Sequence, residues 1–130
     1  MGRNDLRKRL GNDGWKTYQR KRMVLKVLIW RRKTKERLVK SRGGKCERCG
    51  YDKPIYAVYE FHHTDPSKKE FSVSRRGRTC SVAKMQAEVA KCLLLCARCH
   101  RELHALEDER NANRDIAERR EEIERIRKKA

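Results

Sequence analysis

Residues 93 to 104 read LLLCARCHRELH and place two cysteines and two histidines within nine residues. An earlier stretch, residues 45 to 70, reads KCERCGYDKPIYAVYEFHHTDPSKKE and contains a second cysteine pair and a second histidine pair. Thiolates and imidazoles at such short spacings are typical of metal ligands. The two stretches therefore predict a small domain organised around metal ions.

Four of the cysteines form two CxxC pairs, Cys46 with Cys49 and Cys96 with Cys99, with 46 residues between the pairs. The two-residue gap lets both sulfurs of a pair reach one tetrahedral zinc ion, and four thiolates close such a site. We therefore predict a structural Zn2+ ion, whose binding would contribute much of the folding free energy of a chain with a small core. A chance arrangement or a redox pair is the alternative.

The composition favours a polyanionic partner. Only 37% of the 130 residues are hydrophobic, and the net charge is +18. Residues 1 to 45 carry 17 basic and 3 acidic side chains, residues 46 to 104 carry 11 and 7, and residues 105 to 130 carry 8 and 8. Because the excess charge is concentrated in the first third of the chain, nucleic acid is a better explanation than a merely soluble basic surface.

The densest apolar run, MVLKVLIW (Met23 to Trp30), is far shorter than the roughly 20 residues that a membrane-spanning helix needs. We expect no membrane association and a reducing cytoplasm, where six cysteines serve as metal ligands and free thiols rather than as disulfides. The run is apolar almost all round a helix. We predict that it is buried against the rest of the domain, with a homodimer seam as the alternative.

The chain divides into four regions. We predict a flexible basic tail over residues 1 to 14, a basic helical arm over 15 to 44 that Gly43 and Gly44 end, a metal-binding domain over 45 to 106, and a charged C-terminal helix over 107 to 130.

Within the metal-binding domain, IYAVYEFH (residues 55 to 62) has the composition of a strand, and EFSVS (residues 70 to 74) is a second candidate. Ser81 is a plausible N-cap for a helix with apolar residues at helical spacing as far as Cys92, which we expect in the core. The last helix should begin near Cys99, and Cys80 should be a free thiol. The predicted fold class is α+β.

The four histidines form a separate group. His100 and His104 are four residues apart and would share one face of a helix, while His62 and His63 end the predicted strand. A zinc ion joining the two CxxC pairs would bring this strand beside that helix. Three histidines could then hold a divalent cation with open coordination positions, and the fourth could act as a base. A purely structural role for the histidines is the alternative.

These motifs, CxxC, FHHxDP with a following lysine, and CxxCHxxxH, resemble the HNH endonuclease family over about residues 37 to 104. The resemblance implies a zinc-stapled ββα-metal motif, in which a two-stranded hairpin and a helix surround one divalent cation. It also implies hydrolysis of DNA backbone phosphodiesters to 5′-phosphate and 3′-hydroxyl ends, with Mg2+, Mn2+ or another divalent cation, in a prokaryotic or phage-infected cell.

Position by position, the resemblance implies that His63 is the general base and that His62, His100 and His104 hold the catalytic cation. Lys69 matches a lysine that could contact the scissile phosphate, and an ordinary solvated lysine is the alternative. The sequence departs from the family at Lys91, where relatives have an asparagine that braces the loop carrying the base. Because the lysine side chain has no carbonyl acceptor, the bracing must be achieved differently.

Clustered basic side chains are candidates for phosphate contacts. They are Arg20, Lys21, Arg22, Arg31, Arg32, Lys33, Arg75, Arg76 and Arg78. The sequence as a whole predicts a metal-dependent DNA endonuclease acting on double-stranded DNA. The alternatives are a non-catalytic zinc-ribbon module that only binds nucleic acid, and a protein that binds or cleaves RNA.

Overall fold

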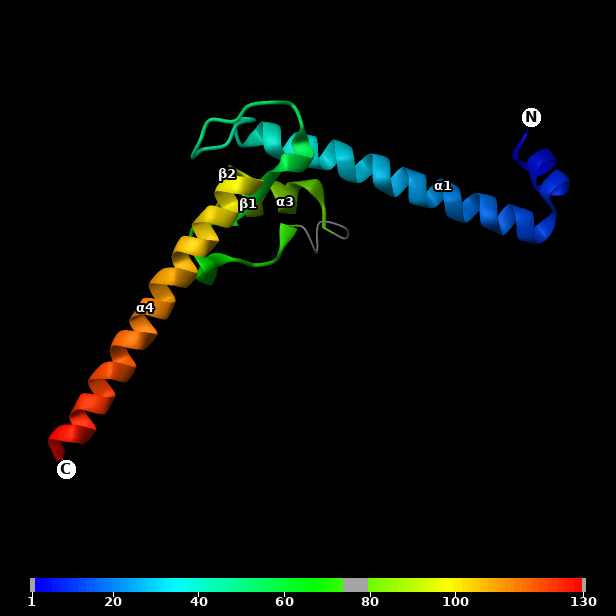
Figure 1. Ribbon diagram of the computed structural model, residues 1–130. Coiled ribbons are helices and arrows are strands. Elements are labelled where there is room, and N and C mark those ends of the chain that lie inside the picture. Colours follow the sequence, from blue (N-terminus) through cyan, green and yellow to red (C-terminus); the bar gives the residue numbers. More distant parts are fainter. Residues whose placement is uncertain (1, 74–79, 130) are drawn as a thin grey trace.

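The computed structural model describes residues 2 to 73 and 80 to 129 and shows a small domain between two long helices (Figure 1). Helix α1 (Arg3–Ser41) and helix α4 (Ala97–Lys129) extend from this domain in different directions. Between them lie strand β1 (Tyr59–His63), helix α3 (Val82–Val89) and strand β2 (Cys92–Cys96). Short 3-10 turns, Tyr56–Val58 and Pro66–Lys68, flank β1. The predicted mixture of helix and a small sheet is confirmed.

The sheet is a two-stranded antiparallel hairpin with a long connection. Tyr59 pairs with Cys96 at one end, and His63 pairs with Cys92 at the other. The prediction of a strand ending at the two histidines is confirmed. The second candidate strand, EFSVS, was wrong, because residues 70 to 73 contain no strand, and β1 pairs instead with the apolar run CLLLC. Cys92 is buried as expected, but it lies on this strand and not on the preceding helix.

Helix boundaries follow local signals. The Ser81 hydroxyl accepts a hydrogen bond from the Lys84 N–H, which confirms Ser81 as the N-cap of α3. Helix α1 ends at Ser41, before Gly43 and Gly44, whose φ angles of 93° and 70° are disfavoured for other residues.

The predicted flexible tail over residues 1 to 14 was wrong, because the structure is helical on both sides of Gly11. The segment between Arg3 and Leu10 is rich in Leu, Lys and Arg, which are good helix formers. Gly11 has a φ of 65° and marks a kink, so the expected break in the helix is only one residue long.

The core is small and lies on both faces of the hairpin. On one face, Leu38 of α1 packs with Met85 and Val89 of α3. Val39, Tyr59 and Leu94 form a second buried group, while Leu95 packs among the cysteines described below. The C-terminal part of α1 is therefore fixed to the domain by Leu38 and Val39.

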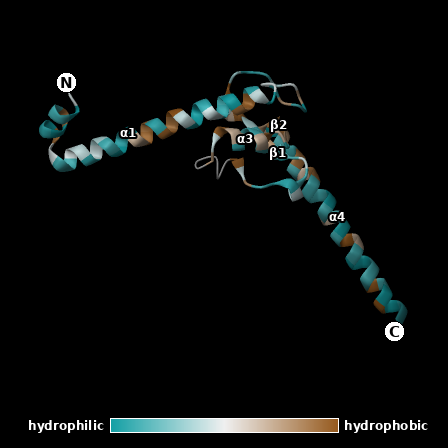
Figure 2. Cartoon of the chain, turned by 180° about the vertical axis from the view of Figure 1, so that it is seen from behind, coloured by the Kyte–Doolittle hydropathy of each residue, from teal (hydrophilic) through white to brown (hydrophobic). Residues whose placement is uncertain are grey.

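The apolar run Met23 to Trp30 does not belong to this core. Its large apolar residues are between 38% and 57% exposed, and α1 carries them away from the domain (Figure 2). The prediction of burial within the chain was wrong, because only the last residue of the run, Trp30, reaches the domain, where it lines a cavity. The homodimer through Met23–Trp30 stays a prediction. No helix in the described ranges is both long and apolar enough to cross a membrane.

Candidate metal centre and active site

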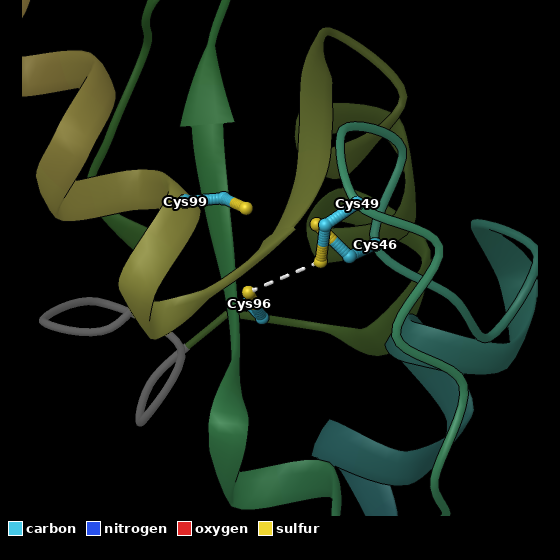
Figure 3. A group of neighbouring side chains, drawn as sticks. All are labelled: Cys46, Cys49, Cys96 and Cys99. Carbon is cyan, nitrogen blue, oxygen red and sulfur yellow. Dashed lines mark hydrogen bonds between the residues drawn. The ribbon is translucent and has the colours of Figure 1, made fainter.

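Four cysteines converge where the loop after α1 meets the start of α4 (Figure 3). The sulfurs of Cys46, Cys49, Cys96 and Cys99 all lie within 4.8 Å of one another, and the Sγ atoms of Cys49 and Cys96 are 3.7 Å apart. Zn–S bonds of about 2.3 Å at tetrahedral angles separate two sulfurs by about 3.8 Å. The donor set and its spacing thus fit a closed four-thiolate zinc site, as the two CxxC pairs predict.

Backbone hydrogen bonds shape the loop that carries the first pair. The Cys46 N–H donates to the Tyr51 carbonyl at 2.8 Å, and the Gly50 N–H donates to the Cys46 carbonyl at 2.9 Å. Gly50 has a φ of 76°, which makes glycine the favoured residue in this turn. The turn brings Cys46 and Cys49 to the same side of the loop, toward the other two thiols.

The thiols differ in acidity. Burial, together with hydrogen bonds to neighbouring thiols that act in the same direction, raises the pKa of Cys99 to about 12. Burial acts on Cys46 as well, but hydrogen bonds with the backbone of Cys49 and Cys96 outweigh it and lower the pKa of Cys46 to about 6. Because zinc binds thiolates, its binding to the cluster releases the protons that the thiols carry.

Three histidines, one from β1 and two from the first turns of α4, form a second cluster. Ligand nitrogens of His62, His100 and His104 lie within 4.8 Å of one another. The Nε2 atoms of His100 and His104 are 3.1 Å apart. Two imidazoles on adjacent positions of an octahedral ion, at about 2.1 Å from it, would place their nitrogens about 3.0 Å apart. The three histidines that the sequence grouped together thus meet at a distance that fits ligands of one ion.

Carboxylates lie behind these imidazoles. The Nδ1 atom of His100 hydrogen-bonds to Glu60, and Glu107 lies 3.5 Å from Nδ1 of His104 and 3.6 Å from Nε2 of His62. Such carboxylates fix ring orientation and increase the basicity of the nitrogen that faces the ion. Burial lowers the pKa of His62 despite the nearby Glu107, which favours the neutral ring that a metal ligand requires.

His63 lies apart from this cluster, because neighbouring side chains on a strand point to opposite faces. His62 faces α4, whereas the Nε2 atom of His63 lies 2.7 Å from a carboxylate oxygen of Glu88 on α3. Burial opposes the charge on Glu88, but hydrogen bonds with Lys91 and His63 lower the pKa of Glu88 to about 2. Because ionised Glu88 can only accept a hydrogen bond, we assign the ring proton to Nε2 of His63.

Lys91 braces the segment after His63 in a way that an asparagine would not. Its ammonium group donates to Glu88 at 2.9 Å, to Glu70 at 2.8 Å and to the Lys68 carbonyl at 3.2 Å. The Lys91 carbonyl accepts a hydrogen bond from the Thr64 hydroxyl at 3.2 Å. These bonds connect α3 to both ends of the segment from residue 64 to residue 70. Lys91 thus braces this segment through its ammonium group, without the side-chain carbonyl that an asparagine would provide.

A cavity of about 550 Å³ opens between α1, β1 and α3. Both His63 and His100 line it, so it extends from the proposed base to the histidine cluster. Lys69 also lines it. Most of the described basic residues that were predicted to contact phosphates do not line this cavity.

Arg31 lines the cavity, and the other predicted basic residues of α1 are exposed along the helix. They are Arg20, Lys21, Arg22, Arg32 and Lys33. Arg75, Arg76 and Arg78 lie outside the described residues. The structure thus places one member of the predicted basic set within the cavity.

Sequence motifs did not point directly to Glu60, Glu88 or Glu107. Glu60 lies two residues before the histidine pair on the same strand, and Glu107 lies three residues after His104, so spacing alone could have suggested both. Glu88 is 25 residues from His63 in the chain, and only the fold brings them together.

Comparisons of this chain with protein-family models, with curated proteins and with solved structures give no match.

Proposed function

We propose that this chain is a metal-dependent DNA endonuclease of the HNH type, which hydrolyses backbone phosphodiesters to 5′-phosphate and 3′-hydroxyl ends. One observation carries the proposal: His100, a member of the three-histidine cluster, lines the same cavity as His63, the fourth histidine, which a buried carboxylate holds. A module that only bound nucleic acid would need neither group.

The histidine cluster suits a catalytic cation. His62, His100 and His104 would hold a divalent ion such as Mg2+ or Mn2+, and their three nitrogens leave further coordination positions open. When bound, this ion would polarise the phosphate and stabilise the leaving 3′ oxygen. Glu60 and Glu107 orient the imidazoles toward it.

His63 suits the role of general base. With the proton on Nε2 directed at Glu88, the neutral ring presents the lone pair of Nδ1, which can accept a proton from water. The Glu88 carboxylate then stabilises the imidazolium that forms, because it is already ionised and hydrogen-bonded to the ring. The water that loses its proton attacks phosphorus, and the bond to the 3′ oxygen breaks.

The long basic helix supports a nucleic-acid substrate. Residues 1 to 45 carry a net charge of +14, the difference of 17 basic and 3 acidic residues, and most of them belong to α1. An exposed helix of this charge would contact phosphates with little dependence on base sequence. Reduced thiols are required for zinc binding, so we propose the cytoplasm of a prokaryotic or phage-infected cell as the setting.

Incubation of supercoiled plasmid with the zinc-loaded protein tests this function. We expect nicked or linear plasmid with added Mg2+ or Mn2+ and intact plasmid with EDTA. Because EDTA could also remove the structural zinc, a parallel reaction with zinc-loaded protein and no added divalent ion serves as the control. If the protein retards DNA in a gel but no metal supports cleavage, the protein is instead a zinc-containing module that only binds nucleic acid.

A further inference from the structure

The cavity beside His63 has a wall formed mostly by residues that precede the part of the chain resembling the nuclease family. That wall is the face of α1 formed by Arg31, Thr34, Lys35 and Leu38, which lies against β1 and α3. Residues three and four apart share one face of a helix, so the packing of Leu38 on Met85 also holds Arg31 and Lys35 over the cavity. Their position is therefore fixed by the core.

This wall carries unneutralised positive charge. The Nε atom of Arg31 is buried and has no hydrogen-bond partner within the described part of the chain. A buried donor of this kind is costly unless a ligand or water satisfies it. Lys69 adds a third basic side chain to the lining, whereas the only carboxylate lining the cavity, among the residues that the structure describes, is Glu60.

Lys35 lies over an aromatic ring, and the charge of that carboxylate acts on it. Its Nζ atom lies 4.9 Å from the centre of the Phe61 ring. Burial lowers the pKa of Lys35, and the charge of Glu60 acts in the opposite direction. Because Glu60 already hydrogen-bonds to His100, its charge is shared between two neighbours. An anion that enters the cavity would therefore still be attracted by much of the positive charge of Lys35.

We propose that this cavity binds the phosphate group of the phosphodiester to be cleaved, with Arg31 and Lys35 of α1 contacting its non-bridging oxygens. The assignment of that phosphate as the scissile one rests on the proposed function. The arginine fork and the lysine ammonium suit two oxygens of one phosphate. The basic helix then has two roles: its exposed residues attract the duplex, and its cavity face completes the active site.

Titration of the zinc-loaded protein with inorganic phosphate tests this without requiring cleavage. The histidine ring signals of His63 and His100 are followed by NMR as phosphate is added, in the wild type, Arg31→Gln, Lys35→Gln and Arg32→Gln. Arg32 is the matched control, since it is the next residue on the same helix but is exposed. Glutamine keeps much of the side-chain volume, and zinc content and circular dichroism check that each variant is folded.

We expect phosphate to shift both ring signals in the wild type and in Arg32→Gln. Arg31→Gln and Lys35→Gln should each weaken phosphate binding roughly tenfold, the loss expected for one charge-assisted hydrogen bond. The proposal is overturned if phosphate leaves the ring signals unchanged, or if Arg31→Gln and Arg32→Gln bind it equally well.

Plasmid nicking by the same variants separates this inference from the proposed function. If the wild type nicks DNA and Arg31→Gln nicks as fast as the wild type, the inference fails and the nuclease function stands. If the wild type does not nick with any metal while phosphate binding still depends on Arg31, the nuclease function fails and the cavity remains a phosphate site.

Discussion

The imidazole of His63 lies 2.7 Å from the carboxylate of Glu88, a residue that is only 1% exposed. This pair joins the end of β1 to α3 and explains why a glutamate lies in the core. The carboxylate also accepts bonds from Lys91 and from the Glu70 N–H at 3.0 Å. Glu88 is therefore the residue that positions His63 and the segment after it.

Replacement of Glu88 by glutamine should lower both stability and cleavage. The amide keeps the shape but loses the charge that Lys91 and His63 contact, and we expect a loss of about 1 to 3 kcal/mol in the free energy of unfolding. Glu70→Gln is the matched control, because Glu70 also contacts Lys91 but is exposed. Chemical denaturation measures the difference. Equal stability of the two variants would contradict the role assigned to Glu88.

The contribution of Glu88 should also depend on pH. Its pKa is held at about 2 in the folded protein, against an ordinary value of 4.5. A carboxyl group with a lowered pKa stabilises the fold fully above its unfolded pKa and loses that contribution as the pH falls through the folded pKa. The stability difference between wild type and Glu88→Gln should therefore shrink below about pH 4.5. Denaturation at several pH values, at equal zinc content, checks this, and a difference that grows in acid would be inconsistent with it.

Loss of one cluster thiol should release zinc and destabilise the domain. We expect Cys99→Ser to abolish stoichiometric zinc binding and to lower the melting temperature strongly, because zinc binding contributes directly to folding. Cys80→Ser is the control, since Cys80 is half-buried and lies outside the cluster. Metal analysis and thermal melts provide the measurement. A Cys99→Ser protein with full zinc content would rule out the four-cysteine site.

The Tyr59 hydroxyl should stabilise the zinc-binding loop. It lies 2.9 Å from the Lys53 carbonyl and 3.2 Å from the carbonyls of Gly44 and Tyr51, and the residue is fully buried. Tyr59→Phe leaves these acceptors without their donor, which should cost about 1 to 2 kcal/mol. Tyr18→Phe, on the remote part of α1, should cost nothing measurable. Thermal melts give the melting temperatures of both variants. Equal melting temperatures would show that the Tyr59 hydroxyl does not stabilise the loop.

Several features could be predicted from sequence because their causes are local. The CxxC spacing predicted the thiol cluster, Ser81 predicted the start of α3, and the glycines after Ser41 predicted the end of α1. In each case, the residues that decide the outcome are close together in the chain.

Other features depend on the tertiary structure. The run Met23 to Trp30 has the composition of a core helix, but its large apolar residues are exposed and only Trp30 lines the cavity of the domain. The run CLLLC was not recognised as a strand, since a short apolar run has no periodicity that separates a buried strand from a helix. The partner of His63 could not be predicted, because Glu88 resembles any other polar helical residue until the hairpin brings the two together.

The most direct test of the central claim is the plasmid nicking rate of His63→Ala against that of the wild type, with Mg2+ or Mn2+ and with DNA affinity measured on the same preparations. The account predicts unchanged zinc content, DNA binding within about twofold, and nicking reduced by roughly 100-fold or more, the contribution typical of a general base. If His63→Ala nicks plasmid at the wild-type rate, the assignment of His63 as the base is wrong, and so is the proposed mechanism.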